Sequence, residues 1–483
     1  RVRISMPPPP FMLAPGERIS ARASLMPPPP PSAPGAYDFA RAAWFKELGA
    51  VGYARGDVRK IDGGAGDAGG WMDRYRIWIA GARQQMTRRI LDALPGASGA
   101  VAAALMTGER AAIPQEVEDA FRDSGLSHLL SISGLHLALV AGVLFAAVRG
   151  GLAAVEPLAL RQPIKKWAAV AALFGAFAYL QLSGAAVATQ RSFVMAAFVL
   201  VALLVDRQAL SMRTVAWAAL AVLALAPESL LDAGFQMSFA AVVALIAAFE
   251  VMETRLADWR GKASLWNRAG VYVGLTALTT LVAGLATAPF AAYHFNRFVD
   301  FALVANLVAV PLTSLWVMPW AVAAFVLMPF GLDGLALAPM GMGVDGVIWV
   351  AETVAAWPGA VMAVPAMPAW GLILIVAGGL WLCLWRQYWR RLGAVAMALG
   401  AVSPWLGSPP HLFVDRNGQA LGARGESGLY VRGSDDLAVE SWLRRSGFSE
   451  RLPWPRLGAS RDGRLRCDNA GCIYRAEGLV VAL

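Results

Sequence analysis

Charge is scarce in the middle of this sequence, and histidine and cysteine are scarce throughout. Of the 483 residues only 16% are charged and 57% are hydrophobic, whereas a soluble globular protein has roughly 45–50% apolar and about 25% charged residues. The charged residues gather in 1–127 and 411–483 and are sparse in 128–407. The pattern argues against a soluble globular protein and predicts a polytopic α-helical membrane protein with a polar part at each end.

Metal-hydrolase and nucleotide motifs are also missing. The sequence holds four histidines and no His-x-His-x-Asp-His pattern, so we do not expect a binuclear metal hydrolase. It has no Gly-x-x-x-x-Gly-Lys-Ser/Thr loop, so we expect no ATPase of its own. We therefore predict no metal, no other cofactor and no enzyme. The chain starts at Arg1 with no visible signal peptide, and we expect that it has lost its beginning.

Only three cysteines are present, and two of them lie close together. Cys383 falls in an apolar run, where it is expected to pack. Cys467 and Cys472 are separated by four residues, which can form a tight turn closed by a disulfide if the compartment is oxidising. Free thiols are the main alternative. A zinc site would need two more ligands, and His411 is the only histidine nearby.

What is present divides the chain into four parts. Residues 1–75 alternate short strands with Pro and Gly, which predicts a small β-rich domain, a barrel or a sandwich. Residues 76–127 form an amphipathic helical connector, or alternatively a helix lying on the membrane surface. Residues 128–407 hold the membrane domain, and 408–483 form a small α+β domain. The expected strands are Val2–Ser5, Arg18–Ala23, Ala50–Arg55, His411–Asp415, Leu429–Arg432 and Glu477–Leu483, with a helix at Leu437–Arg445.

The membrane domain contains about ten apolar runs of the roughly 17–25 residues that a spanning helix needs, although several are short or broken by proline. The runs lie near 129–148, 167–183, 187–205, 213–226, 234–251, 270–292, 302–329, 335–356, 369–386 and 392–407. Proline runs at Pro7–Pro10 and Pro27–Pro31 bar helix at the other end of the chain and suit polyproline spacers.

Cations between the runs indicate the orientation. Basic residues follow the first, third, fifth and ninth runs, and all these loops fall on one side, which predicts that this side is the cytoplasm. These cations are Arg149, Arg161, Lys165, Lys166, Arg207, Arg213, Arg255, Arg260, Lys262, Arg268, Arg386, Arg390 and Arg391. Both polar ends then lie outside the cytoplasm, in agreement with a disulfide. The net charge of +9 suits nucleic acid or lipid headgroups, although basic loops alone also account for it.

The stretch Gly125–Gly142 enters an apolar run with two histidines and several small polar residues. If the stretch is one helix, His128 and His136 lie about 12 Å apart along it and about 80° apart around it, so they do not form a close pair of metal ligands. The other members are Ser131, Ser133 and Gly134. Either these residues let helices pack closely, or they line a pore or gate.

Three further apolar runs carry polar residues. Arg191 begins the third run and either reaches lipid headgroups or faces a wet cavity, where its guanidinium could meet phosphate. Gln236 and Ser238 lie in the fifth run and Asn306 in the seventh. Hydrogen bonding between helices is the simpler explanation for these three, and lining of a transport path is the alternative.

Several blocks, in order, resemble the ComEC family of bacterial competence proteins. These blocks are Pro31–Phe39 with Gly49–Tyr53, Leu105–Arg110, Gly125–Gly142, Gln190–Met195, Pro227–Phe239, and Pro289–Asn306 with Pro311. The resemblance covers roughly residues 30–330. It implies an OB-like fold for residues 1–75 and a competence-type channel domain at 128–407. In natural transformation such a protein passes single-stranded DNA across the bacterial inner membrane.

The resemblance also implies partners and limits. The expected partners are single-stranded DNA, membrane lipids and other competence proteins, namely a DNA receptor and a cytoplasmic helicase. Family members usually have transmembrane helices before the OB-like domain, and many end in a β-lactamase-like domain with a metal motif that is not found here. A small-solute transporter, or a membrane scaffold or enzyme without transport, are the alternatives. A wide wet cavity with basic lining favours DNA, and a narrow closed pocket favours a small solute.

Overall fold

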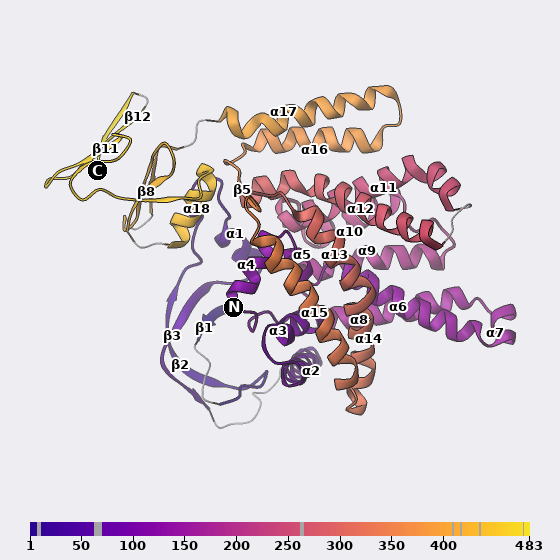
Figure 1. The fold of residues 1–483 in the computed structure, drawn as a ribbon. Coiled ribbons are helices and arrows are strands. Elements are labelled where there is room, and N and C mark those ends of the chain that lie inside the picture. Colours follow the sequence, from indigo (N-terminus) through magenta and orange to yellow (C-terminus); the bar gives the residue numbers. More distant parts are fainter. Residues whose placement is uncertain are drawn as a thin grey trace.

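The computed structural model shows a mostly helical chain with a small β-rich part at each end (Figure 1). It describes residues 1–6, 11–61, 70–260, 265–407, 410–415, 418–433, 436–476 and 478–483, with only the backbone described at 253–260, 265–269 and 436–437. The proline run Pro7–Pro10, Lys262 and Glu477 lie outside these residues, as do the side chains of Arg255, Arg260 and Arg268.

The N-terminal part is a three-stranded sheet in the order β1-β3-β2. Strand β1 (Val2–Ser5) runs parallel to β3 (Ala50–Lys60), and β2 (Ile19–Met26) runs antiparallel to β3. Helix α1 (Phe39–Phe45) begins where the Asp38 carboxylate accepts a hydrogen bond from the Arg41 backbone N–H at 2.9 Å. The three predicted strands are confirmed, but the described residues form an open sheet rather than a barrel or sandwich. The OB-like fold stays a prediction.

The segment predicted as a connector is helical but is not a simple solvated link. It contains α2 (Trp71–Ala93), α3 (Gly96–Thr107) and α4 (Gln115–Asp123). Every residue of α3 from Gly99 to Thr107 is buried. Small side chains explain this burial, because Gly and Ala let α3 approach α2 and α15 closely. Part of the predicted connector therefore belongs to the core of the helical bundle.

Six helical segments among the described residues are long and apolar enough to cross a membrane. They are Gly134–Ala153, Val187–Leu204, Ala233–Met252, Gly270–Phe295, Ala302–Phe330 and Gly334–Ala355. They correspond to α6 (Gly134–Ala153), α9 (Val187–Leu204), α11 (Ala233–Arg260), α12 (Leu265–Phe295), the run α13 (Ala302–Leu312), η2 (Thr313–Val317), α14 (Met318–Leu327) and η3 (Met328–Phe330), and α15 (Gly334–Ala355).

The prediction of about ten spans is not confirmed, although each of the ten runs is largely helical. The remaining runs form α8 (Ile164–Leu182), α10 (Met212–Leu225), α16 (Ala369–Leu384) and α17 (Leu392–Leu406). Helices of 14 to 16 residues rise only about 21–24 Å, which is less than the roughly 30 Å of a hydrocarbon core. Short helices α5 (Ser127–Leu130) and α7 (Glu156–Arg161) and the 3-10 turns η1 (Pro227–Leu231) and η4 (Tyr388–Arg391) complete the bundle.

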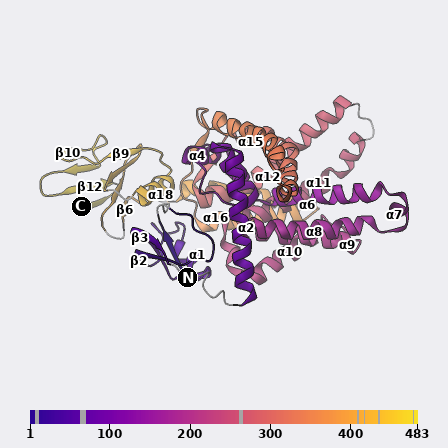
Figure 2. The ribbon, with the colours of Figure 1, turned by 90° about the horizontal axis from the view of Figure 1, so that it is seen from below.

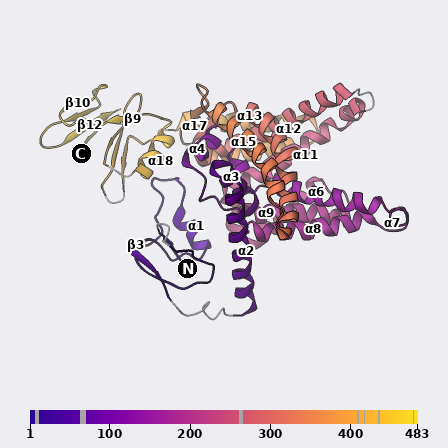
Figure 3. The same cartoon turned by 60° about the horizontal axis from the view of Figure 1, so that its bottom comes forward.

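Four clusters of buried apolar side chains are described in the bundle. The two largest lie between α3, α4 and the α13–α15 segment and between α6, α8, α9 and α14. The two smaller ones lie between α12 and α16 and between α10 and α11. Helix α2 runs across α6 and α8 instead of alongside them (Figures 2 and 3). Helices α16 and α17 form a hairpin at one edge of the bundle (Figure 1), where a Cβ at Gly378 would lie only 2.4 Å from the Gly393 carbonyl oxygen.

The C-terminal part contains two four-stranded sheets in the orders β6-β7-β8-β9 and β10-β11-β12-β13. Their strands are Leu412–Val414, Leu421–Arg424, Leu429–Arg432, Arg451–Pro453, Gly458–Ala459, Leu465–Cys467, Cys472–Ala476 and Leu479–Ala482. The predicted strands and helix are present, while β7 and β9–β12 were missed. Cys467 and Cys472 face each other across the β11–β12 hairpin and form a disulfide with Cα atoms 4.0 Å apart.

Helix α18 (Asp436–Ser446) joins the C-terminal part to the rest of the chain. The fully buried Trp442 donates its indole N–H to the Ser32 carbonyl at 3.1 Å, and Arg445 donates to the carbonyls of Pro34 and Gly35. The Arg445 carbonyl in turn accepts from the Ala366 N–H. Both β-rich parts therefore lie at the same end of the bundle, with α7 at the other end (Figure 1). Which side of a membrane this end faces stays a prediction.

Candidate functional site

The stretch that carries His128 and His136 is not one helix, so the predicted helical geometry of the pair is wrong. Helix α5 ends at Leu130, residues 131–133 are extended, and α6 begins at Gly134. His128 is exposed, and its Nδ1–H donates to the Gly125 carbonyl at 3.2 Å. The chain breaks at 131–133, where Ser133 caps the start of α6. Gly125, with a positive φ of 78°, separates α4 from α5 instead.

His136 lies fully buried at the first turn of α6. Its Nδ1 accepts from the Ser133 backbone N–H at 3.2 Å and lies 3.0 Å from the Ser133 hydroxyl. A neutral ring then carries its proton on Nε2, and Nε2 has no partner among the described residues. A buried donor left unpaired costs about 1–3 kcal/mol, so this group is retained at a cost to stability.

Arg191 pairs with the carboxylate of Asp232, a partner that the sequence did not indicate. Its Nη1 donates to Asp232 Oδ1 at 3.0 Å, and Asp232 Oδ1 also accepts from the Phe235 N–H at the start of α11. The Arg191 side chain is 7% exposed and that of Asp232 is 50% exposed. Arg191 Nε is buried without a partner among the described residues. Because a Cβ at position 234 would lie 2.5 Å from Nη2, Gly234 makes room for the guanidinium.

Among the other predicted residues, Gln236 bonds to a second helix, whereas Asn306 bonds within its own helix. Gln236 Oε1 accepts from His294 Nε2–H at 2.8 Å, and Gln236 Nε2 donates to the Leu230 carbonyl. Asn306 is buried and donates to the Ala302 carbonyl of its own helix at 2.7 Å. Ser131, Ser133 and Ser238 are half-buried, and Gly134 is exposed with Ser192 Oγ beside it. Arg191, Asp232, Gln236 and His294 thus join α9, α11 and α12, and we call these four residues the inner polar cluster.

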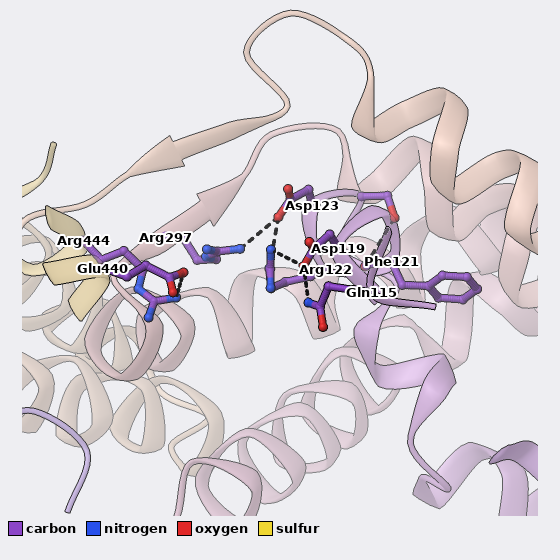
Figure 4. Close-up of polar contacts among 9 residues, drawn as sticks. Gln115, Asp119, Phe121, Arg122, Asp123, Arg297, Glu440 and Arg444 are labelled. Carbon is purple, nitrogen blue, oxygen red and sulfur yellow. Dashed lines mark hydrogen bonds and ion pairs between the residues drawn. The ribbon is translucent and has the colours of Figure 1, made fainter. Parts of the chain in front are cut away.

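A second polar cluster, which the sequence did not reveal, lies where α4, β4 and α18 meet (Figure 4). Asp123 accepts from Arg122 at 3.3 Å and from Arg297 of β4 (Arg297–Val299) at 2.9 Å. Arg122 also pairs with Asp119 at 2.6 Å. On α18 nearby, Arg444 pairs with Glu440. Burial, together with the neighbouring Arg122 guanidinium, lowers the pKa of Arg297, which nevertheless stays protonated.

Only the pairings between residues close together in the sequence could be found from the sequence alone. Asp119 and Arg122 are three residues apart on one helix face, which a search for ion pairs would find. The partners Asp123 and Arg297 are 174 residues apart, and β4 pairs with β5 (Val361–Ala363) only in the folded chain. The same holds for Arg89, which donates to Asp333 at 2.6 Å across 244 residues. No local pattern predicts such contacts.

The described bundle is tightly packed at its centre. A cavity of about 10 Å³ lies there among side chains of α3, α4, α5, η2 and α15, and such a volume admits about one water molecule. Its lining is apolar except for Thr313. Among the described residues no group of three His, Cys, Asp or Glu side chains is placed to hold a metal ion.

Fold and site together define a polytopic helical membrane protein with clusters of paired, partly buried polar side chains between its elements. The family model described as "Competence protein" matches residues 105–389, which include the six candidate spans and both clusters apart from α18. The chain therefore belongs to the competence protein family, whose members take part in DNA uptake. The ComEC-type resemblance is confirmed.

Curated relatives agree with this membership. The chain is 33% identical to competence protein ComA of Neisseria gonorrhoeae over 75% of this chain and 49% of that protein. It is 26% identical to ComE operon protein 3 of Bacillus subtilis over 53% of this chain and 30% of that protein. It is 27% identical to the uncharacterized protein YcaI of Escherichia coli over 68% of this chain and 48% of that protein. The chain thus spans about half or less of these relatives. No solved structure matches it.

Proposed function

We propose that this chain is the membrane part of a channel that passes single-stranded DNA into the cytoplasm during natural transformation. The process in this proposal, DNA uptake, is inferred from membership of the competence protein family. The inner polar cluster is the observation that best supports a channel. Its guanidinium, carboxylate, imidazole and amide lie within an apolar bundle, where polar groups cost free energy and are retained when they have a function. The proposal assigns no catalytic step to this chain.

Arg191 is the phosphate contact in this proposal. Its pairing with the half-exposed Asp232 holds the guanidinium in place, and its buried Nε, which has no partner among the described residues, meets an anion once α9 and α11 separate. His136, with its unpaired Nε2–H, is the second donor on the path. Gln236, Ser238 and Asn306 brace the helices around it, and His128, Ser131, Ser133 and Gly134 form the neighbouring break between α5 and α6. Many weak contacts suit passage better than one tight one.

The N-terminal sheet is the entry surface in this proposal. Exposed aromatic side chains, Tyr37, Trp44 and Tyr53, lie on or beside it, and the strands carry Arg22, Arg55 and Arg59. Aromatic faces stack bases and cations follow the phosphate backbone without sequence preference, so binding should weaken as salt rises.

Passage needs a wider state than the one described. Single-stranded DNA does not fit a cavity of about 10 Å³, so α6, α9 and α11 must separate, or a second copy must complete the path. The protein lies in the inner membrane in this proposal, with both terminal parts outside the cytoplasm. It works with a DNA receptor outside and a helicase inside.

Uptake of labelled DNA tests the proposal. In a competence-deficient strain carrying the full-length protein, Arg191→Ala and His136→Ala should reduce DNA in the cytoplasm at least tenfold while DNA at the surface persists. Arg149→Ala, at an exposed position near the end of α6, is the matched control and should take up DNA normally. Normal uptake by both cluster variants at equal protein level would refute the proposed path.

A further inference from the structure

A cavity in the helical part lies between α2 and α8, away from both polar clusters. Its volume is about 420 Å³, and Trp71, Met72, Tyr75, Arg76, Phe177 and Gln181 line it. This volume is within the roughly 300–1,000 Å³ of small-molecule sites. Three aromatic rings and a methionine form its walls, and one guanidinium and one amide are its polar groups. The lining therefore suits a molecule with an apolar body and an anionic head.

The α8 wall of the cavity belongs to a surface that faces lipid. Helix α8 packs between the candidate spans α6 and α9. On its outer face Trp167, Val170, Phe174 and Phe177 are 44%, 40%, 70% and 44% exposed, and their spacing of three and four residues puts them on one stripe. An exposed apolar stripe on a helix of a membrane bundle contacts acyl chains. The cavity thus opens toward the hydrocarbon along Phe177 and Phe174.

The α2 wall has the composition of a membrane–water interface. Helix α2 runs across α8 (Figures 2 and 3), and its Trp71, Tyr75 and Trp78 lie on one face at spacings of four and three residues. Trp71 and Trp78 are 69% and 65% exposed. Trp and Tyr concentrate at the level of lipid headgroups. A helix lying across the bundle with such a face is an interfacial helix.

From these contacts we infer that the cavity binds one phospholipid. The Arg76 guanidinium takes the phosphate, since its only ion pair among the described residues, to Asp73, is a long 3.7 Å contact between exposed groups. The Gln181 amide meets the headgroup or ester region, and an acyl chain runs along Phe177. A nucleotide of single-stranded DNA is a poorer occupant, because a lipid-facing wall leaves the next phosphates without cations or water.

The bound lipid would set the position of the N-terminal sheet. The opposite side of α2 contacts the N-terminal segment, where Gln84 donates to the Leu13 carbonyl at 2.7 Å and Ile77 packs against Gly16. At its other end α2 is fixed to the bundle by the Arg89–Asp333 pair. Lipid in the cavity then holds the first turns of α2 against α8, and with them the segment before β2.

Lipid retention by the purified full chain tests this inference without any DNA, so its result is independent of the proposed channel. The chain is reconstituted in nanodiscs of phosphatidylglycerol and phosphatidylethanolamine and then extracted in mild detergent. Native mass spectrometry measures the mass of the protein together with any lipid that it retains. We expect one retained phospholipid per chain. Arg76→Ala and Phe177→Ala should each reduce its occupancy at least fivefold, and Arg76→Lys should restore most of it.

The matched control is Arg74→Ala, which removes an exposed cation of the same helix that does not line the cavity and should retain the lipid. Equal retention by Arg76→Ala, Phe177→Ala and the control would overturn the inference. A photo-reactive oligo-dT that crosslinks to Trp71 or Tyr75, with crosslinking lost in Arg76→Ala and unaffected by added phospholipid, would assign the cavity to DNA and would equally overturn it.

Discussion

Trp442 joins the core of the C-terminal part to the N-terminal segment. It is fully buried, its ring stacks on Phe413 with centroids 5.5 Å apart, and its N–H binds the Ser32 carbonyl 410 residues away. Replacing a buried Trp by Ala costs about 3–5 kcal/mol. At about 1.4 kcal/mol per tenfold, opening of this core should become roughly a hundred to several thousand times more frequent in Trp442→Ala.

Hydrogen–deuterium exchange of the full chain in nanodiscs measures this opening, because exchange of core amides follows the free energy of local unfolding. Peptides covering β6 and β8 should exchange faster by that factor in Trp442→Ala. Trp442→Phe keeps the stacking but removes the hydrogen bond to the carbonyl of the exposed Ser32, which water can then satisfy, and should lose only about 0.5–1.5 kcal/mol. Glu440→Ala, exposed on the same helix, is the control. A change below threefold in Trp442→Ala would refute the reasoning.

Three further predictions concern the outer parts of the chain. Gln419→Cys should react with an impermeant maleimide on intact spheroplasts, and labelling only after permeabilisation would place the C-terminal part in the cytoplasm. Cys467 and Cys472 should resist alkylation until they are reduced, and labelling without reductant would contradict the disulfide. Replacing both by Ser should lower the free energy of local unfolding by only about 2 kcal/mol, because the closed loop is short. Burial acts to raise the pKa of Asp462, but hydrogen bonds from Ser460, from the Arg464 and Glu426 backbones and from Tyr430 together lower it. An Asp whose folded pKa is depressed stabilises the fold above its unfolded pKa of about 3.9 and loses this as pH falls through the folded value. Exchange of 458–466 should therefore accelerate in acid below about pH 4, and Asp462→Asn should abolish that dependence; an unchanged acid response in the variant would assign it to another group.

Much of the fold follows from local pattern. Apolar runs predicted the six candidate spanning helices, because burial of apolar side chains in lipid needs no particular partner. The strands Val2–Ser5 and Leu429–Arg432 matched the predicted bounds, since short β-prone runs bounded by proline or glycine are local signals. The Gly125–Gly142 block was recognised by its histidines and small polar residues at the entrance to an apolar run. Its continuous helix was wrong, because the break at 131–133 depends on how Ser133 caps α6.

The sequence by itself determined the class of protein, the positions of its helices and the residue types that a path for DNA would use. Only the tertiary structure decided which charges meet. Arg191 with Asp232, Arg297 with Asp123 and Arg89 with Asp333 are 41, 174 and 244 residues apart, and each partner is set by how helices pack and where chains cross. The physical reason is that apolar periodicity fixes which residues are buried, whereas the pairing of a buried charge depends on whichever segment the completed fold brings within a few ångströms.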